Sequence, residues 1–343
     1  MDGNFVPSKS IFFGIAMRLA RVLPASAFNW IAQWYIFLNK ALAIREPLIK
    51  RDALLAYRAS LFHEYLKDPD VKRQKLAWMR RFLDKKSMAA VNRLIESYEY
   101  VYRNNWLEYG IWFGKPDKRM EREIAQSIGE LKVPSCFSLA EEIFYWHCGL
   151  RHVPAAARKV ENRDFLDCGA FIGDSAFVFS KLYRPRRVYS FEPEGRNFER
   201  LRENIGRCGL ANVTPLRLGV GKRRGKALMQ SCDGSSFIEG SEGVGKKESV
   251  GIVDIDSFAQ GSGLDVGLIK MDVEGFELNA VKGALKTIKR SKPVLLISVY
   301  HTPQDLFEIL PLVKKACGKY RFMVRKNVQA AHPMEVMLIA VPG

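Results

Sequence analysis

The chain has 343 residues, of which 48% are hydrophobic and 27% are charged, and its formal net charge is +17. This length and apolar content exclude a disordered chain and suffice for a substantial core, which we expect to form two structural units. Its six cysteines include no C-x-x-C pair, so we expect reduced thiols in a cytoplasmic protein. The basic charge, which is spread along the chain, fits a solvated basic surface, acidic substrates or an anionic membrane equally well, whereas no zinc-finger or RRM signature indicates nucleic acid.

Residues 1–135 predict a helical amino-terminal region. From residue 53 to 104, apolar side chains recur every three or four positions, and Asp68-Pro69-Asp70 interrupts the pattern. Residues 22–39 carry no charge, but Pro24 and several polar residues make them a poor membrane span. A buried or membrane-surface helix is favoured there, so peripheral membrane contact through residues 10–45 stays open.

The second unit, residues 136–343, is organised around a glycine turn that follows a predicted strand ending at Leu166. Gly169 and Gly173 lie four residues apart in this turn, and residues 176–182 have helical character. A second short strand, residues 187–191, then ends on Glu192. A strand, a glycine turn, a helix and a strand that ends in an acid form the first βαβ unit of a nucleotide-type fold.

The chemistry of this turn favours a particular ligand. Its D-x-G-x-x-x-G spacing lacks the G-x-G-x-x-G fingerprint of dinucleotide sites, and Asp174 at the helix start would repel phosphate. The helix start to Ser175 offers unpaired N–H groups, and Glu192 can accept two hydrogen bonds from a ribose diol. S-adenosylmethionine fits better, since its ammonium group would be attracted to Asp167. An NAD-dependent oxidoreductase is the alternative.

Strands and helices alternate through the rest of the chain and predict a doubly wound α/β sheet. An additional helix over residues 138–147, with Ser138 as its cap, leads into this unit. Residues 222–250 predict a hairpin with a flap, and the last two strands predict an antiparallel pair at one edge. The expected strands are residues 213–220, 250–258, 266–271, 293–299, 320–325 and 335–341, and the expected helices are residues 197–207, 278–288 and 306–316.

Ligands bind beyond the carboxyl ends of the strands in such a sheet. The polar or glycine residues expected at these ends are Asp167, Glu192, Gly219-Val220-Gly221, Asp272-Val273-Glu274-Gly275 and Tyr300-His301.

Four of these stretches resemble the FkbM family of S-adenosylmethionine-dependent methyltransferases. They are residues 167–173, Phe191-Glu192-Pro193, the K-M-D-V-E-G-F-E run from Lys270 to Glu277, and Ser298-Val299-Tyr300-His301. The resemblance covers residues 136–343, and the run from Lys270 is its most family-specific part. Phe171 departs from the family, which often has a small polar residue there, and the amino-terminal region matches no motif of it.

The resemblance implies a class I methyltransferase-like (Rossmann-like) fold and methyl transfer, usually to a hydroxyl of a sugar, glycan or polyketide-type product. It also implies that Asp167, Gly169 and Gly173 hold the methionine part of the cofactor, that Glu192 holds the ribose, and that residues near Val220 hold the adenine. We therefore expect a small-molecule or glycan acceptor.

Two residues are candidates for the chemistry of methyl transfer. His301 at a strand end is the best candidate for a general base, although a structural role is equally open. Asp272 has three open roles: base, ligand of Mg²⁺, or cap of the Glu274-Gly275 turn, and the cap is favoured over the metal. We further expect Glu274 and Glu277 to pair with Lys270 or Lys282.

One further alternative is a catalytically silent adaptor. In that hypothesis the basic helical region binds a membrane or a partner, and the oligomeric state is open.

Overall fold

The computed structural model describes residues 47–103, 117–232, 235–238, 246–329 and 333–343. Residues 10–45, for which peripheral membrane contact stays open and is not favoured, lie outside these ranges. Within them, no helix combines the length and the apolar character that are needed to cross a membrane.

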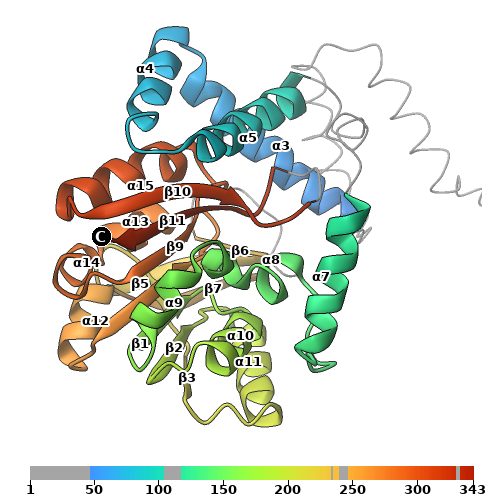
Figure 1. Ribbon diagram of the computed structural model, residues 1–343, viewed down its shortest axis with the longest axis vertical. Coiled ribbons are helices and arrows are strands. Elements are labelled where there is room, and N and C mark those ends of the chain that lie inside the picture. Colours follow the sequence, from blue (N-terminus) through green and yellow to red (C-terminus); the bar gives the residue numbers. More distant parts are fainter. Residues whose placement is uncertain (1–46, 104–116, 233–234, 239–245, 330–332) are drawn as a thin grey trace, which may run out of the picture.

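A seven-stranded sheet forms the centre of the molecule (Figure 1). Its strand order is β10 (Tyr320–Lys326), β11 (Val336–Pro342), β9 (Val294–Ser298), β8 (Val266–Met271), β1 (Asp164–Cys168), β2 (Arg187–Phe191) and β3 (Val213–Leu216). The five strands from β9 to β3 are parallel, whereas β11 runs antiparallel between β9 and β10. The predicted class I methyltransferase-like sheet with an antiparallel edge is therefore confirmed.

Helices cover both faces of the sheet, as a parallel sheet requires. One face carries α3 (Pro47–Leu66), α4 (Pro69–Met79), α5 (Lys85–Arg103), α12 (Ile255–Gly261), α13 (Glu277–Lys282), α14 (Leu285–Ser291) and α15 (Pro303–Ala316). The other face carries α7 (Lys118–Glu130), α8 (Glu141–Phe144), the 3₁₀ helix η2 (His147–His152), α9 (Pro154–Val160), α10 (Asp174–Leu182) and α11 (Gly195–Arg207).

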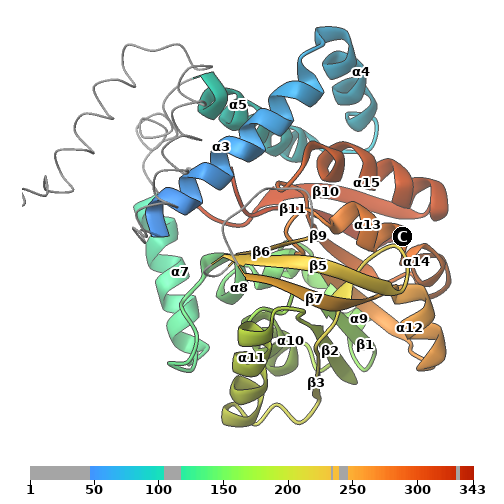
Figure 2. The ribbon, with the colours of Figure 1, turned by 180° about the vertical axis from the view of Figure 1, so that it is seen from behind.

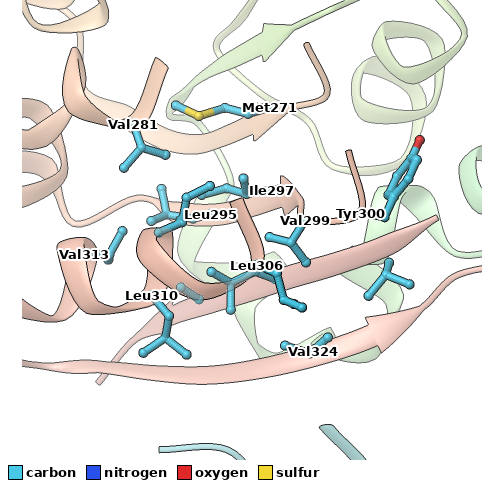
Figure 3. Close-up of a cluster of buried hydrophobic side chains, with 14 of the residues drawn as sticks. Met271, Val281, Leu295, Ile297, Val299, Tyr300, Leu306, Leu310, Val313 and Val324 are labelled. Carbon is cyan, nitrogen blue, oxygen red and sulfur yellow. The ribbon is translucent and has the colours of Figure 1, made fainter. Parts of the chain in front are cut away.

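Two cores arise from the alternation of side chains along the strands. Phe165 of β1 packs into one core and its neighbour Leu166 into the other. Figure 3 shows the second core, where Leu295 and Ile297 of β9 meet Leu306 and Leu310 of α15. Because the central strands are buried on both faces, only their ends can present polar groups to a ligand.

The amino-terminal helices share this second core with the sheet, and Figures 1 and 2 show α3 and α5 beside β10 and α15. Phe62 of α3 stacks on Tyr98 of α5, with ring centroids 4.4 Å apart. The Tyr98 hydroxyl donates a hydrogen bond of 2.6 Å to the carbonyl of Tyr300. The predicted break is confirmed, because Asp68 caps α4 and Pro69 begins it. The expected domain boundary at residue 135 stays a prediction.

A smaller sheet corrects two of the predicted strands. It has the order β4 (Gly219–Val220), β7 (Lys246–Val253), β5 (Gly225–Cys232) and β6 (Ser235–Ile238), which includes the predicted hairpin. Residues 213–220 divide between the two sheets. The strand predicted for residues 250–258 ends at Val253, because the Asp254 carboxylate accepts a hydrogen bond from Ser257 N and starts α12.

Two predicted helices are shorter than expected. The helix predicted for residues 138–147 is reduced to α8, which Ser138 does not cap, and positive φ angles at His147 and Cys148 prevent its continuation. The helix predicted for residues 278–288 is interrupted at Gly283. A Cβ at Gly283 would lie 2.1 Å from the carbonyl oxygen of Gly221, so a close backbone contact breaks this helix.

Candidate active site

The glycine turn connects β1 to α10 and is held by backbone hydrogen bonds to β2. The N–H groups of Gly169 and Ala170 both donate to the carbonyl of Phe191, at 3.0 and 2.9 Å. Gly169 and Gly173 have φ angles of +80° and +92°, which glycine adopts without strain. The predicted strand, glycine turn and helix are therefore present.

Gly169 also lets two strand ends approach each other. A Cβ at this position would lie 1.8 Å from the carbonyl oxygen of Asp272, which follows β8. The turn after β1 and the turn formed by residues 272–275 are thus in direct backbone contact. Only a residue without a side chain permits this contact.

Gly169→Ala is expected to destabilise the fold by at least about 1–3 kcal/mol, because the left-handed φ and the clash act together. Gly206→Ala is the matched control, since a Cβ there, within α11, meets nothing within 4 Å. That substitution should stabilise the protein by about 0.5–1 kcal/mol. Urea unfolding of both variants measures the difference, and equal stabilities would contradict the proposed backbone contact.

Glu192 lies at the end of β2, where the sequence placed it. Its carboxylate accepts hydrogen bonds of 2.9 Å from the N–H groups of Phe171 and Glu194. Burial raises its pKa to about 7. The bond to Phe171 supports a residue with a φ of +47° in the glycine turn. The structure thus shows a role for Glu192 in the turn, and its contact with a ribose stays a prediction.

Asp167 is fully buried below the turn rather than exposed on it. Its Oδ2 accepts a hydrogen bond of 2.7 Å from the Ser175 hydroxyl, and its Oδ1 lies 3.3 Å from Lys270 Nζ. Lys270 Nζ also donates to the carbonyl of Gly169 at 2.7 Å. Burial lowers the pKa of Lys270, but the carboxylates of Asp167 and Asp272 outweigh this and raise it overall. The expected contact of Asp167 with the methionine part stays a prediction.

Further carboxyl groups gather around the glycine turn. Burial raises the pKa of Asp174, in the first turn of α10, to about 6. Burial also raises the pKa of Glu142, on α8, to about 7, and the charges of Asp174 and Asp272 add to this effect. These acids suit a ligand that carries positive charge. Val220, expected near the adenine, is buried in the smaller sheet, so its role also stays a prediction.

Glu277 organises the turn formed by residues 272–275. Its carboxylate accepts hydrogen bonds from Val273 N at 2.7 Å and Gly275 N at 2.9 Å, and its Oε1 lies 2.8 Å from His301 Nδ1. The cap predicted for Asp272 is therefore supplied by Glu277. The predicted pairs of Glu274 and Glu277 with lysines are wrong as well, because Glu274 forms its ion pair with Arg58 of α3 and Glu277 lies against His301.

His301 follows β9, and its side chain is almost completely buried. Its Nε2 has no hydrogen-bond partner within the described ranges and lies 3.6 Å from both Asp272 Oδ1 and Glu274 Oε2. Burial and the charge of Arg58 lower the pKa of His301. A neutral ring with one nitrogen near Glu277 and the other without a partner can accept a proton at Nε2. The structure thus brings both predicted catalytic residues together.

Asp272, Glu277 and His301 also offer atoms within 4.8 Å of one another that could surround a cation. Both oxygens of Glu277 already accept hydrogen bonds from backbone N–H groups, which leaves it poorly suited to such a role. The alternative of Mg²⁺ at Asp272 stays a prediction that is not favoured.

One residue of the site could not be found from the sequence. Arg58 of α3 forms an ion pair of 2.8 Å with Glu274, which is 216 positions away. Arg58 belongs to an amphipathic helix without a recognisable motif. Its apolar pattern predicts a buried face but does not say which acid that face meets.

Comparisons with known proteins agree with the predicted resemblance. Residues 167–321 match the family model of the methyltransferase FkbM domain. The chain is 27% identical over 164 residues to the hexuronic acid methyltransferase AglP of Haloferax volcanii. This match covers 46% of the chain and 65% of AglP, which is less than two thirds of that relative.

Two solved structures are also similar to this chain. Methyltransferase FkbM from Methylobacillus flagellatus KT is 21% identical, with a TM-score of 0.42, and the match covers 71% of this chain and 62% of that one. A putative methyltransferase from Streptococcus mutans, in complex with SAH, is 12% identical with a TM-score of 0.37, and the match covers 57% and 97% of the two chains. The sheet has the strand order expected of a class I methyltransferase-like fold, and its likeness to the methyltransferase FkbM domain extends over residues 167–321 of this chain.

Proposed function

We propose that the protein is an S-adenosylmethionine-dependent O-methyltransferase that acts on a hydroxyl of a sugar, a glycan or a related small molecule. The observation that carries this proposal is the position of His301 Nε2, which has no hydrogen-bond partner within the described ranges and lies, like the glycine turn, at the carboxyl ends of the parallel strands. The similarity to a hexuronic acid methyltransferase supports a sugar acceptor.

The residues that follow the carboxyl ends of these strands suit S-adenosylmethionine. The backbone of Gly169 and Gly173 allows a ligand to approach closely, and Glu192 stands at the end of the neighbouring strand. The carboxyls of Asp174 and Glu142 favour the positive sulfonium and ammonium groups. The cofactor, when bound, supplies an electrophilic methyl group.

In the proposed mechanism, His301 Nε2 would take the proton of the acceptor hydroxyl, whose oxygen is the nucleophile toward the methyl group that the cofactor would supply. Glu277 holds the opposite side of the ring and stabilises the positive charge that develops there. Asp272 lies beside Nε2 and can accept a hydrogen bond from the acceptor. The chain therefore contributes orientation and proton removal, as an in-line substitution requires.

Calorimetry with S-adenosylhomocysteine and with NAD tests the cofactor. We expect binding of S-adenosylhomocysteine alone, because the turn lacks the dinucleotide fingerprint. If a folded sample binds NAD instead, the result supports an NAD-dependent oxidoreductase. If it binds neither compound, the proposal is wrong and a catalytically silent adaptor is favoured. Transfer of a radiolabelled methyl group to glycans with and without hexuronic acid then tests the acceptor.

A further inference from the structure

Arg58 is the one cation of the described amino-terminal helices that forms an ion pair with the 272–275 turn. It lies on α3, whose neighbouring residues Ala59 and Phe62 are part of the hydrophobic core. Only 4% of Arg58 is exposed. A guanidinium group buried to this extent needs a charged partner, so its surroundings indicate what it does.

The partner of Arg58 is a residue of the candidate active site. Its Nη2 lies 2.8 Å from Glu274 Oε2, and its guanidinium carbon lies 5.4 Å from the centre of the Tyr300 ring. Tyr300 is in turn fixed from α5, because its carbonyl accepts a hydrogen bond from the Tyr98 hydroxyl. Two helices of the amino-terminal region therefore hold the residue immediately before His301.

The Glu274 oxygen that binds Arg58 also faces the catalytic candidate. The same Oε2 lies 3.6 Å from His301 Nε2, and the backbone of Glu274 has a left-handed φ of +56°. Two cationic groups thus compete for one carboxylate: the guanidinium of Arg58 and the imidazolium form of His301. As long as Arg58 occupies Oε2, His301 has less to gain from protonation.

We propose that Arg58 is a positioning residue for methyl transfer, which holds Glu274 away from His301 and keeps Nε2 available to the acceptor hydroxyl. This inference rests on the proposed function. In this proposal α3 contributes a side chain that positions active-site residues, which differs from a role in binding a membrane or a partner. It also explains why a buried arginine stands on a helix that matches no motif of the domain.

Charged and titratable groups face His301 from several elements. The 272–275 turn contributes Asp272 and Glu274, α13 contributes Glu277, α15 contributes Asp305, and α3 contributes Arg58. Burial and Arg58 lower the pKa of His301, and the three acids Glu274, Asp272 and Asp305 oppose them. Arg58 is therefore the cation whose removal should change the protonation of His301 most.

The test compares the pH dependence of kcat/KM in Arg58→Gln, Glu274→Gln and the double variant. Arg58→Gln removes a positive charge beside His301, so the acid limb should move on the order of one pH unit higher. Glu274→Gln removes a negative charge, so its acid limb should move to lower pH. The double variant should lie close to the wild type. Arg325→Gln is the matched control. Arg325 likewise forms a 2.8 Å ion pair between the amino-terminal region and the sheet, but its partner is Asp84, which lies just before α5 and not in the 272–275 turn.

Each outcome bears on one statement. An active wild type in which Arg58→Gln lowers the rate but leaves the pH profile unchanged overturns the inference and shows a merely structural arginine. If Arg58→Gln does not fold, two other variants test the inference. The acid limb of Glu274→Gln should move to lower pH, and Arg58→Lys should keep the pH profile of the wild type. NMR titration of labelled His301 gives the same shifts without turnover, so an inactive wild type overturns only the proposed function.

Discussion

His301→Gln should reduce kcat for methyl transfer by about 10²–10⁴-fold, which is the usual contribution of a general base. Glutamine can retain a hydrogen bond to Glu277, but it cannot take a proton from the acceptor. Binding of S-adenosylhomocysteine should be unchanged, because the glycine turn belongs to another strand end. His63→Gln provides the control, since the His63 ring stacks on Tyr102 of α5, away from the 272–275 turn. Equal rates in the wild type and His301→Gln would exclude the base.

The rate of the wild type should rise with pH and level off above about pH 8. Burial and the charge of Asp272 raise the pKa of Glu277 to about 8, while burial and Arg58 lower the pKa of His301. The two side chains lie 2.8 Å apart and titrate as a pair, which must lose its shared proton before Nε2 can act as a base. Glu277→Gln removes the negative charge, so its acid limb should move to lower pH while kcat falls.

Lys270→Met should destabilise the fold by about 3–5 kcal/mol, because it leaves the carboxylate of Asp167 buried without its cation. Lys270 is 5% exposed and Asp167 is fully buried, so water cannot replace the lost partner. The carbonyl of Gly169 also loses the hydrogen bond of 2.7 Å that it accepts from Lys270 Nζ. Both effects act on the glycine turn, and cofactor binding should weaken with stability.

A double-mutant cycle with Asp167→Asn separates the charge from the packing. The double variant should recover part of the loss, since a neutral amide replaces the isolated carboxylate and can still accept a hydrogen bond from Ser175. Urea unfolding of the four proteins measures the coupling. Additive losses would mean that the two side chains do not interact, in conflict with the 3.3 Å between Lys270 Nζ and Asp167 Oδ1.

Local patterns were sufficient to predict the order of elements around the site. A strand that stops before a glycine turn, and strands that stop at Glu192 and Asp272, have boundaries set by neighbouring residues. In a parallel sheet the carboxyl ends of the strands lie on the same side, so the candidate residues could be grouped before any contact was known. Where local patterns failed, as at Gly283, a close contact with a distant backbone interrupts the helix.

The amino-acid sequence by itself therefore determined the sheet, the glycine turn and the proximity of Asp272 to His301. The tertiary structure alone decided which charges meet: Lys270 with Asp167, Glu277 with His301, and Arg58 with Glu274. The physical reason is that the apolar spacing along a helix or strand specifies which face is buried. The partner of a buried charge depends instead on which distant element packs against that face.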